Sequence, residues 1–310
     1  MFRAAEPALA DFVVCFVMPS QLSQVLCAAI AEWQSAPAAY ASIYRKYLGV
    51  IPPVPFDSCK GGEWIPAQEI DPASSLHAVL ERCRLRIGHA DAAPYVFRAN
   101  AAELAGLDYE TGRALTAIVA RHYPRLSPDP EWVLVSGSYA EESAKFTALH
   151  DGMGNGDFDL ALSGQANIGS EIAQVDWLCA TDLCFTNFVY TGRGGFSLGT
   201  PTTRDEIVSK LGTLGEITLG YVANNPGPSA PSAKNLARDA GENVTLMAFQ
   251  GAGALNQSIA DAEVHFAVGD GIASSWLSLT QWPRVTNFNV QVALSENPPQ
   301  QVAGFTLTGA

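Results

Sequence analysis

The feature that most constrains the fold is the segment 149–177, which contains a helix end, a tight turn, an apolar run and a loop. The Gly-Asn-Gly sequence at 154–156 predicts the helix end, because both residue types tolerate the left-handed backbone of a helix C-cap. The run Phe158–Leu162 is mostly apolar, as expected of a strand that is buried on both faces. A Ser-Gly pair follows at its carboxyl end. Open α/β sheets bind ligands at that edge, so the segment predicts an α/β fold with a ligand site here.

The same segment resembles the strand–loop region of the family 3 solute-binding proteins, the amino-acid-type periplasmic binding proteins. The matching positions are Leu149, Gly156, Asp159, Ser163, Gly164, Val175 and Asp176, with Trp177 in place of the family's phenylalanine. One position departs from the pattern. Glu171 stands where the family has the arginine that binds the α-carboxylate of the ligand. If Glu171 faces the ligand, a carboxylate at short range meets a repulsion of about 1–4 kcal/mol.

The front of the chain carries a second resemblance to this family. An apolar run at 12–18 predicts a buried strand, apolar residues at helical spacing predict a helix from about residue 20, and residues 38–48 predict a second helix ended by Gly49. This order resembles the C-terminal end of a family 3 protein. The matching positions are Ser20, Leu22, Leu26, Ala31, Glu32, Ile43, Tyr44, Lys46, Tyr47 and Gly49.

Together the two resemblances imply an α/β, two-lobed type II periplasmic-binding-protein fold that is circularly permuted. The predicted parts are the C-terminal portion of the first lobe moved to the front (1–49), a linker rich in proline and glycine (50–75), the first-lobe body (76–187), the second lobe (188–285), and a return strand and tail (286–310). Permutation is compatible with stability because domain termini often lie close together at the surface. An excerpt from a tandem array, with the tail of one copy before the body of the next, gives the same order.

Charge and composition exclude several function classes. The formal net charge is −13 over 310 residues, whereas binding to nucleic acid or to an anionic membrane requires a basic face. No segment has the roughly 18 consecutive apolar residues of a membrane helix, so membrane insertion is not expected. The N-terminus lacks the basic and apolar regions of a signal peptide. As given, the chain is therefore expected in the cytoplasm, or in the periplasm or outside the cell if it is an excised mature piece.

Cysteine and histidine spacing predicts neither a metal site nor a cofactor. None of the six cysteines forms a CxxC pair, and no cysteine–histidine cluster has zinc spacing. The sequence does not decide whether Cys179 and Cys184 form a disulfide. His89 is the histidine expected nearest the ligand-side loops.

The resemblance also implies which residues line a cleft between the two lobes. They are Tyr95, Ser163, Gly164, Ala166 and Glu171 on the first lobe, and Asn224, Asn225 and Asp270 on the second. Asp270 matches the acidic residue that binds the ammonium group of the ligand in the family. Its alternative role is that of a turn residue before Gly271. Glu171 either faces the ligand or lies exposed at a helix N-terminus, where the macrodipole favours an anion.

Two functions follow from these implied positions. The first is a module that binds a small polar or cationic metabolite, but not a standard α-amino acid, between two lobes. The alternative is a cytoplasmic enzyme on the same scaffold, because cyclohexadienyl dehydratase, a relative of the family, uses this fold for elimination. Glu171 and Asp270 would then act as an acid–base pair. That relative keeps the arginine that this chain lacks. Neither the ligand nor the oligomeric state is indicated by the sequence.

Overall fold

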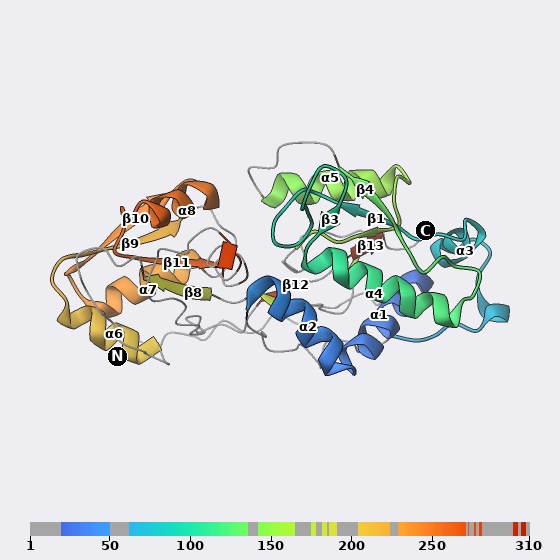
Figure 1. Ribbon diagram of the computed structural model, residues 1–310, viewed down its shortest axis with the longest axis horizontal. Coiled ribbons are helices and arrows are strands. Elements are labelled where there is room, and N and C mark those ends of the chain that lie inside the picture. Colours follow the sequence, from blue (N-terminus) through green and yellow to red (C-terminus); the bar gives the residue numbers. More distant parts are fainter. Residues whose placement is uncertain are drawn as a thin grey trace, which may run out of the picture.

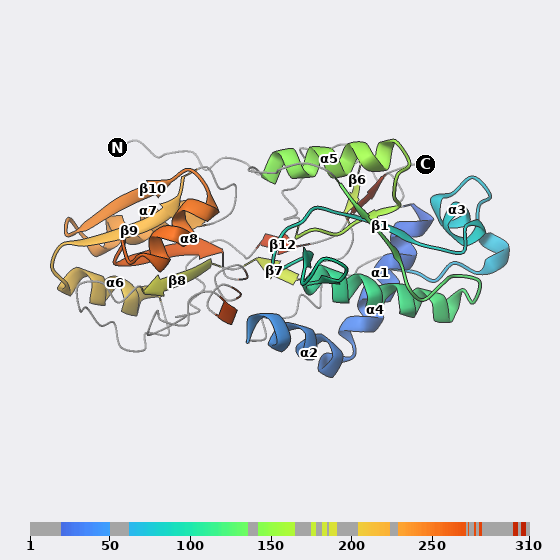
Figure 2. The same cartoon turned by 45° about the horizontal axis from the view of Figure 1, so that its top comes forward.

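The computed structural model describes residues 20–49, 62–135, 142–164, 175–177, 182–184, 186–190, 204–223, 229–270, 272, 276, 279–280, 300–302 and 305–307. These segments form two α/β lobes that lie side by side along the long axis of the molecule (Figures 1 and 2). The first lobe contains the helices α1 to α5, and the second contains α6 to α8.

The first lobe is built around a mixed sheet with the strand order β4-β1-β5-β13-β6. Its strands are β1 (Arg86–His89), β4 (Glu131–Leu134), β5 (Leu160–Ala161), β6 (Val175–Trp177) and β13 (Phe305–Leu307), and β2 (Phe97–Arg98) and β3 (Leu104–Ala105) form a separate hairpin. Strand β1 runs parallel to both β4 and β5, with Ile87 opposite Trp132 on one side and Leu160 on the other. The three strands therefore end at one edge of the sheet.

Helices cover both faces of this sheet. The helices are α1 (Gln21–Gln34), α2 (Pro37–Leu48), α3 (Ser75–Glu81), α4 (Leu107–His122) and α5 (Glu142–Gly154), with a 3₁₀ turn η1 (Ala67–Glu69). On one face, α1 to α4 contribute to a single large hydrophobic cluster. On the other face, Leu149 and Met153 of α5 pack with Phe158 and Ala161. Helix α5 ends at Gly154, and Gly156 has a φ of +75°, which confirms the predicted helix end.

The second lobe has the same layered plan with the strand order β10-β9-β11-β8. Its elements are β8 (Thr186–Tyr190), α6 (Arg204–Thr213), β9 (Ile217–Val222), α7 (Ser229–Ala240), β10 (Val244–Phe249), α8 (Ala252–Ala260) and β11 (Phe266–Asp270). The mostly apolar runs 217–222 and 244–249 predict strands, and β9 and β10 have these bounds. Two hydrophobic clusters, one with α6 and α7 and one with α8, pack against the sheet.

A pair of antiparallel strands and the aromatic side chain of Trp276 join the lobes. Strand β7 (Asp182–Cys184) pairs with β12 (Gln300–Val302) between the lobes, and the chain continues from β7 into β8 of the second lobe. From β12 it returns to β13 of the first lobe. Trp276 packs against the α8 cluster, and its ring lies 4.9 Å from that of Phe97 and 6.0 Å from that of Tyr47.

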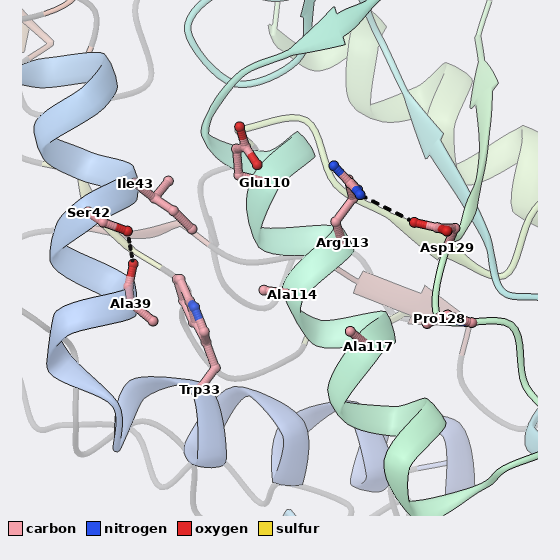
Figure 3. A pocket seen from close by; sticks show the side chains of 10 residues that line it. All are labelled: Trp33, Ala39, Ser42, Ile43, Glu110, Arg113, Ala114, Ala117, Pro128 and Asp129. Carbon is pink, nitrogen blue, oxygen red and sulfur yellow. Dashed lines mark hydrogen bonds and ion pairs between the residues drawn. The ribbon is translucent and has the colours of Figure 1, made fainter.

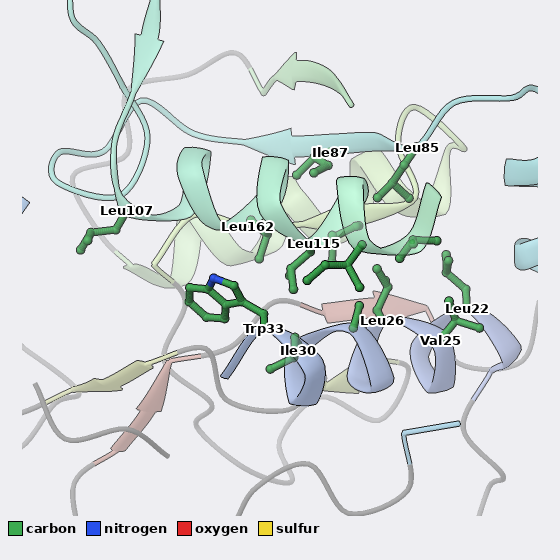
Figure 4. Packing of buried hydrophobic residues seen from close by; sticks show 14 of the residues in the cluster. Leu22, Val25, Leu26, Ile30, Trp33, Leu85, Ile87, Leu107, Leu115 and Leu162 are labelled. Carbon is green, nitrogen blue, oxygen red and sulfur yellow. The ribbon is translucent and has the colours of Figure 1, made fainter. Parts of the chain in front are cut away.

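The first two helices complete the core of the first lobe. Ser20 caps α1 by accepting from the Ser23 amide, and Gly49 ends α2 in the left-handed conformation with a φ of 68°. The apolar face of α1 points toward α4 and the sheet (Figure 4). Its fully buried members include Val25, Leu26 and Ile30. Each large side chain buried in this way stabilises the fold by roughly 1.5–3 kcal/mol.

The second half of the predicted linker is docked on this core. Trp64 stacks on His122 with 3.6 Å between ring centroids. The Tyr123 hydroxyl donates to the carbonyl of Ile65 and accepts from its amide. Residues 62–65 therefore lie along α1 and α4, whereas residues 50–61 lie outside the described part of the chain.

Some sequence-based expectations fall elsewhere. The strand expected at 12–18 lies outside the described residues, and so does the β-like run 287–294, which is the expected return strand. The segment after 294, expected to be a soft tail, contains β12 and β13. These strands are three residues long and pair only with distant parts of the chain, so local periodicity does not reveal them. Neither Cys27, which is half-buried, nor Cys83, which is exposed, forms a disulfide within the described part of the chain.

Replacing Leu26 by alanine tests the packing of the front helices into the first lobe. We expect Leu26→Ala to lower the free energy of unfolding by about 2–5 kcal/mol, because it leaves a cavity in a filled core. The matched control is Leu246→Ala on β10, where the side chain is 36% exposed and the expected change is within about 0.5 kcal/mol. Urea denaturation measures both. Equal and small losses would show that α1 is not part of this core.

Candidate functional site at the strand-end edge of the first lobe

The parallel strands of the first lobe bring two loops together at their carboxyl ends. His89 ends β1 and is followed by Ala90, and the pair Ser163 and Gly164 follows β5. The Ser163 hydroxyl accepts from the Ala90 amide at 3.1 Å and donates to the Ala90 carbonyl at 3.3 Å. Ser163 is fully buried. This serine therefore joins the two loops and does not present its hydroxyl at the surface of the edge.

The loop after β1 is fixed to the start of α4. The carbonyl of Pro94 accepts from the Leu107 amide, and the carbonyl of Tyr95 accepts from the Asp108 amide, each at 2.9 Å. These bonds satisfy amides that have no partner inside the helix. Gly106 before the helix has a φ of +130°, and a Cβ there would lie 2.1 Å from the Tyr95 carbonyl oxygen. The close approach explains why glycine occupies this position.

Tyr95 forms the aromatic wall of the edge. Its half-buried ring lies directly against the backbone of Gly164, where a Cβ would come within 2.3 Å of the ring atom Cδ2. Gly164 has a φ of +63°, a backbone conformation that glycine adopts without strain. The structure therefore brings together three of the residues predicted for the cleft, namely Tyr95, Ser163 and Gly164.

Two charged side chains hold the peptide that joins Ser163 to Gly164. The Gly164 amide donates to Oδ2 of Asp108 at 2.5 Å. The Lys145 ammonium donates to the Ser163 carbonyl at 2.9 Å. The N–H and the C=O of one peptide unit are thus bound by an acid from α4 and a base from α5. Both side chains are buried, with residue exposures of 5% for Asp108 and 7% for Lys145.

Burial shifts the pKa values of two groups at this edge. Desolvation raises the pKa of Asp108 from 3.8 to about 6, although the Gly164 amide and the Lys145 charge both act in the opposite direction. Desolvation also lowers the pKa of His89, which is 2% exposed and packs edge-on against Trp132. Burial therefore favours the neutral form of the His89 side chain.

Of the other predicted cleft residues, the structure places the backbone of Asp270. Ala166, Glu171, Asn224 and Asn225 lie outside the described residues. Asp270 is the last residue of β11, opposite Thr186 of β8. Strand β11 ends on the side of the second lobe that faces the first (Figure 1). The backbone of Asp270 is thus at the inter-lobe side.

Sequence reasoning did not identify Asp108 and Lys145. Asp108 lies in the first turn of a helix, where an acidic residue is ordinary because it complements the macrodipole. Lys145 lies in α5, which has no clear apolar face in sequence. One signal was available: Gly106 directly precedes the helix start that the sequence predicts at Leu107 and Asp108. Its burial, however, depends on the meeting of α4 with the end of β5.

A separate hollow of about 500 Å³ lies on the outside of the first lobe (Figure 3). Trp33, Ala114 and Ala117 are among the residues that line it, and so are Arg113 and Asp129, which form an ion pair. The indole nitrogen of Trp33 has no hydrogen-bond partner, but surrounding atoms shield it from any occupant. The hollow shares no residue with the strand-end edge, so we place the candidate site at that edge.

The described segments contain neither a candidate metal cluster nor a helix that could cross a membrane. No group of three or more histidine, cysteine, aspartate or glutamate residues there could hold a metal ion. Within the same segments, none of the helices is both long and apolar enough to span a bilayer.

Comparisons with known proteins identify the fold. No family model matches the sequence, and no curated protein matches it. Among solved structures, an ancestral cationic amino acid solute-binding protein, AncCDT-1, matches with a TM-score of 0.53 at 12% identity, over 76% of this chain and 87% of that one. PfVFT1 of Plasmodium falciparum matches with a TM-score of 0.55 at 11% identity, over 94% of this chain and 96% of that one. The chain therefore has the two-lobed type II periplasmic-binding-protein fold found in family 3 solute-binding proteins.

Two glycine substitutions separate the contact with Tyr95 from backbone strain. In Gly164→Ala the new methyl group would overlap the Tyr95 ring at a positive φ, whereas in Gly156→Ala, at a φ of +75°, it would meet nothing within 4 Å. We expect Gly156→Ala to cost about 1 kcal/mol of unfolding free energy and Gly164→Ala at least about 2 kcal/mol. Denaturant unfolding of both variants checks this. Equal costs would mean that Tyr95 does not pack on Gly164.

Proposed function

We propose that the chain is a solute-binding module that holds a small polar or cationic metabolite between its two lobes. The observation that carries this proposal is the strand-end edge of the first lobe, where Tyr95 packs on a peptide fixed by Asp108 and Lys145. Ligands of open α/β sheets bind at such edges. A protein of the same fold is described as binding cationic amino acids, which supports a small-molecule ligand.

Charge supports a ligand without an exposed α-carboxylate. Glu171 aligns with the family's carboxylate-binding arginine, and Asp270 aligns with its ammonium-binding acid, so two acidic side chains are proposed at the cleft. The net charge of −13 adds a weak attraction for cations. An amine, a betaine or a neutral polar molecule therefore fits the proposal better than a standard α-amino acid.

We also propose that the fold is circularly permuted. Helices α1 and α2 come before residues 50–75 in the chain, yet they pack in the core of the first lobe. In the resemblance, a helix pair of this kind ends the chain. A helix pair that comes first in the chain but packs in the core of the first lobe supports the permutation.

A thermal-shift screen against amines, betaines, amino acids and aromatic acids tests the binding function. Any solute that binds the native state raises the melting temperature, by mass action. We expect at least one amine or betaine to do so, with titration calorimetry confirming one site per chain. A screen in which every class leaves the melting temperature unchanged would contradict the proposal.

Removing the aromatic wall should weaken binding of the solute found in that screen. We expect Tyr95→Ala to raise its Kd at least about tenfold, because an aromatic contact and its buried area contribute roughly 1–3 kcal/mol. Tyr109→Ala is the matched control, since Tyr109 lies in the first turn of α4, near Tyr95, but its ring packs against Trp132. If both variants bind like the wild type, the ligand does not lie at this edge.

Reversing the charge at Glu171 should restore affinity for α-amino acids. Glu171→Arg is expected to create micromolar to millimolar binding where the wild type shows none, since it replaces repulsion by attraction at the carboxylate position. Glu242→Arg, at an exposed position of the second lobe, makes the same change in net charge. Calorimetry that finds no gain for Glu171→Arg, or an equal gain for both variants, would reject the alignment at this residue.

A further inference from the structure

The peptide between Ser163 and Gly164 is bound at both ends by buried charges of opposite sign. Asp108 accepts from its N–H at 2.5 Å, and Lys145 donates to its C=O at 2.9 Å. We propose that Asp108 and Lys145 are positioning residues that clamp this peptide and so hold the Tyr95 wall in its ligand-binding geometry. This inference rests on the proposed binding function.

The clamp matches the electrostatics of the peptide unit. A peptide carries a dipole of about 3.5 D with its positive end at the N–H and its negative end at the C=O. An acid at the first end and a base at the second bind it in one orientation, and hydrogen bonds to charged groups are about twice as strong as neutral ones. A flip of the peptide would turn each end toward a charge of the same sign. The left-handed backbone of Gly164, with a φ of +63°, is thereby fixed.

The orientation of this peptide determines the position of the aromatic wall. The ring of Tyr95 lies so close to the Gly164 backbone that a Cβ there would come within 2.3 Å of it. The backbone of Tyr95 is also attached to the clamp, because its carbonyl accepts from the Asp108 amide. Asp108 therefore contacts both the loop after β1 and the loop after β5. A shift of its side chain would move both loops relative to each other.

The energetics favour a functional over a purely structural role for Asp108. A buried ionised carboxylate needs paired charges and hydrogen bonds to offset its desolvation. Here that offset is incomplete, since burial still raises the pKa of Asp108 to about 6. Asparagine has nearly the same shape and can accept the same hydrogen bond without a charge. A chain selected only for stability has little reason to keep an acid at this position.

The raised pKa has a definite sign for stability. Because the folded-state pKa of about 6 lies above the ordinary value of 3.8, the stability linked to this group is fully present below about pH 4 and is lost as the pH rises through 6. Lys145 is the charged group that acts on Asp108 among the residues the structure describes, and its field lowers the pKa. The carboxyl group of Asp108 is therefore ionised at pH 8 and mostly protonated at pH 5.

Nuclear magnetic resonance of the Gly164 amide tests the clamp without any ligand. Serine precedes glycine at two places in the chain, so labelling serine carbonyls with ¹³C and glycine amides with ¹⁵N selects Gly137 and Gly164, and Ser136→Ala removes the first signal. We expect the Gly164 signal to titrate between pH 4 and 8 with a midpoint near 6. Asp108→Asn should abolish this titration, and Lys145→Met should move its midpoint upward.

Controls and a second measurement keep the test decisive. Asp129→Asn makes the same chemical change at an exposed ion pair and should leave the Gly164 titration unchanged. Asp108→Asn should also raise the melting temperature relative to the wild type more at pH 8 than at pH 4. A Gly164 signal that does not titrate, or that titrates identically in Asp108→Asn and Lys145→Met, would overturn the clamp.

Binding of the solute found in the screen then connects the clamp to function. We expect Asp108→Asn to raise its Kd at pH 8 at least fivefold while the melting temperature does not fall, which a merely structural residue would not do. If no solute binds the wild type, the proposed function fails but the Gly164 titration still decides the clamp. If the titration is as expected and the Kd is unchanged in Asp108→Asn, the positioning role is rejected.

Discussion

The parallel alignment of β4, β1 and β5 is the constraint on which the site depends. It places the carboxyl ends of these strands at one edge, so that the loops after β1 and β5 meet there. Ser163 then joins the two loops through both polar groups of Ala90. Only because this edge is closed in this way can Asp108 and Lys145 be buried next to the same peptide. The chemistry of the edge is thus a consequence of strand direction.

The edge in turn needs a core behind it. Helix α1 supplies a continuous apolar face to α4 and the sheet, and α2 extends that cluster toward Trp276 of the second lobe. Residues 62–65 add a further layer, because Trp64 packs against Tyr123 and the Tyr123 hydroxyl donates to the Ile65 carbonyl. The N-terminal α4 turn that carries Asp108 is therefore supported by segments from the front of the chain. Loss of those segments would expose the helix that carries the acid side of the clamp.

Local patterns were sufficient for much of the fold. The mostly apolar runs 217–222 and 244–249 predicted β9 and β10 with their observed bounds, and the Gly-Asn-Gly turn predicted the end of α5. The resemblance placed Ser163 and Gly164 at the ligand edge, and in the structure Gly164 lies against the Tyr95 ring. In each case the information lies within about ten residues of sequence.

Features that depend on distant segments were not predictable in this way. Strand β13 is three residues long and acquires its place between β5 and β6 only by pairing across the sheet. Asp108 and Lys145 are charged residues on helices, a pattern that ordinarily indicates a solvent-facing surface. Their burial follows from the closure of one edge by three elements. Charged residues that are buried against expectation are where functional sites are to be sought.

Small-angle X-ray scattering tests the central claim, that a solute is held between the two lobes. The lobes are joined by the β7–β12 pair and by the contact of Trp276 with Phe97, so closure on a ligand by hinge motion shortens the long axis of the molecule. We expect the radius of gyration to fall when a solute that raises the melting temperature is added at saturation. An unchanged radius of gyration with that solute bound at one site per chain would contradict binding between the lobes.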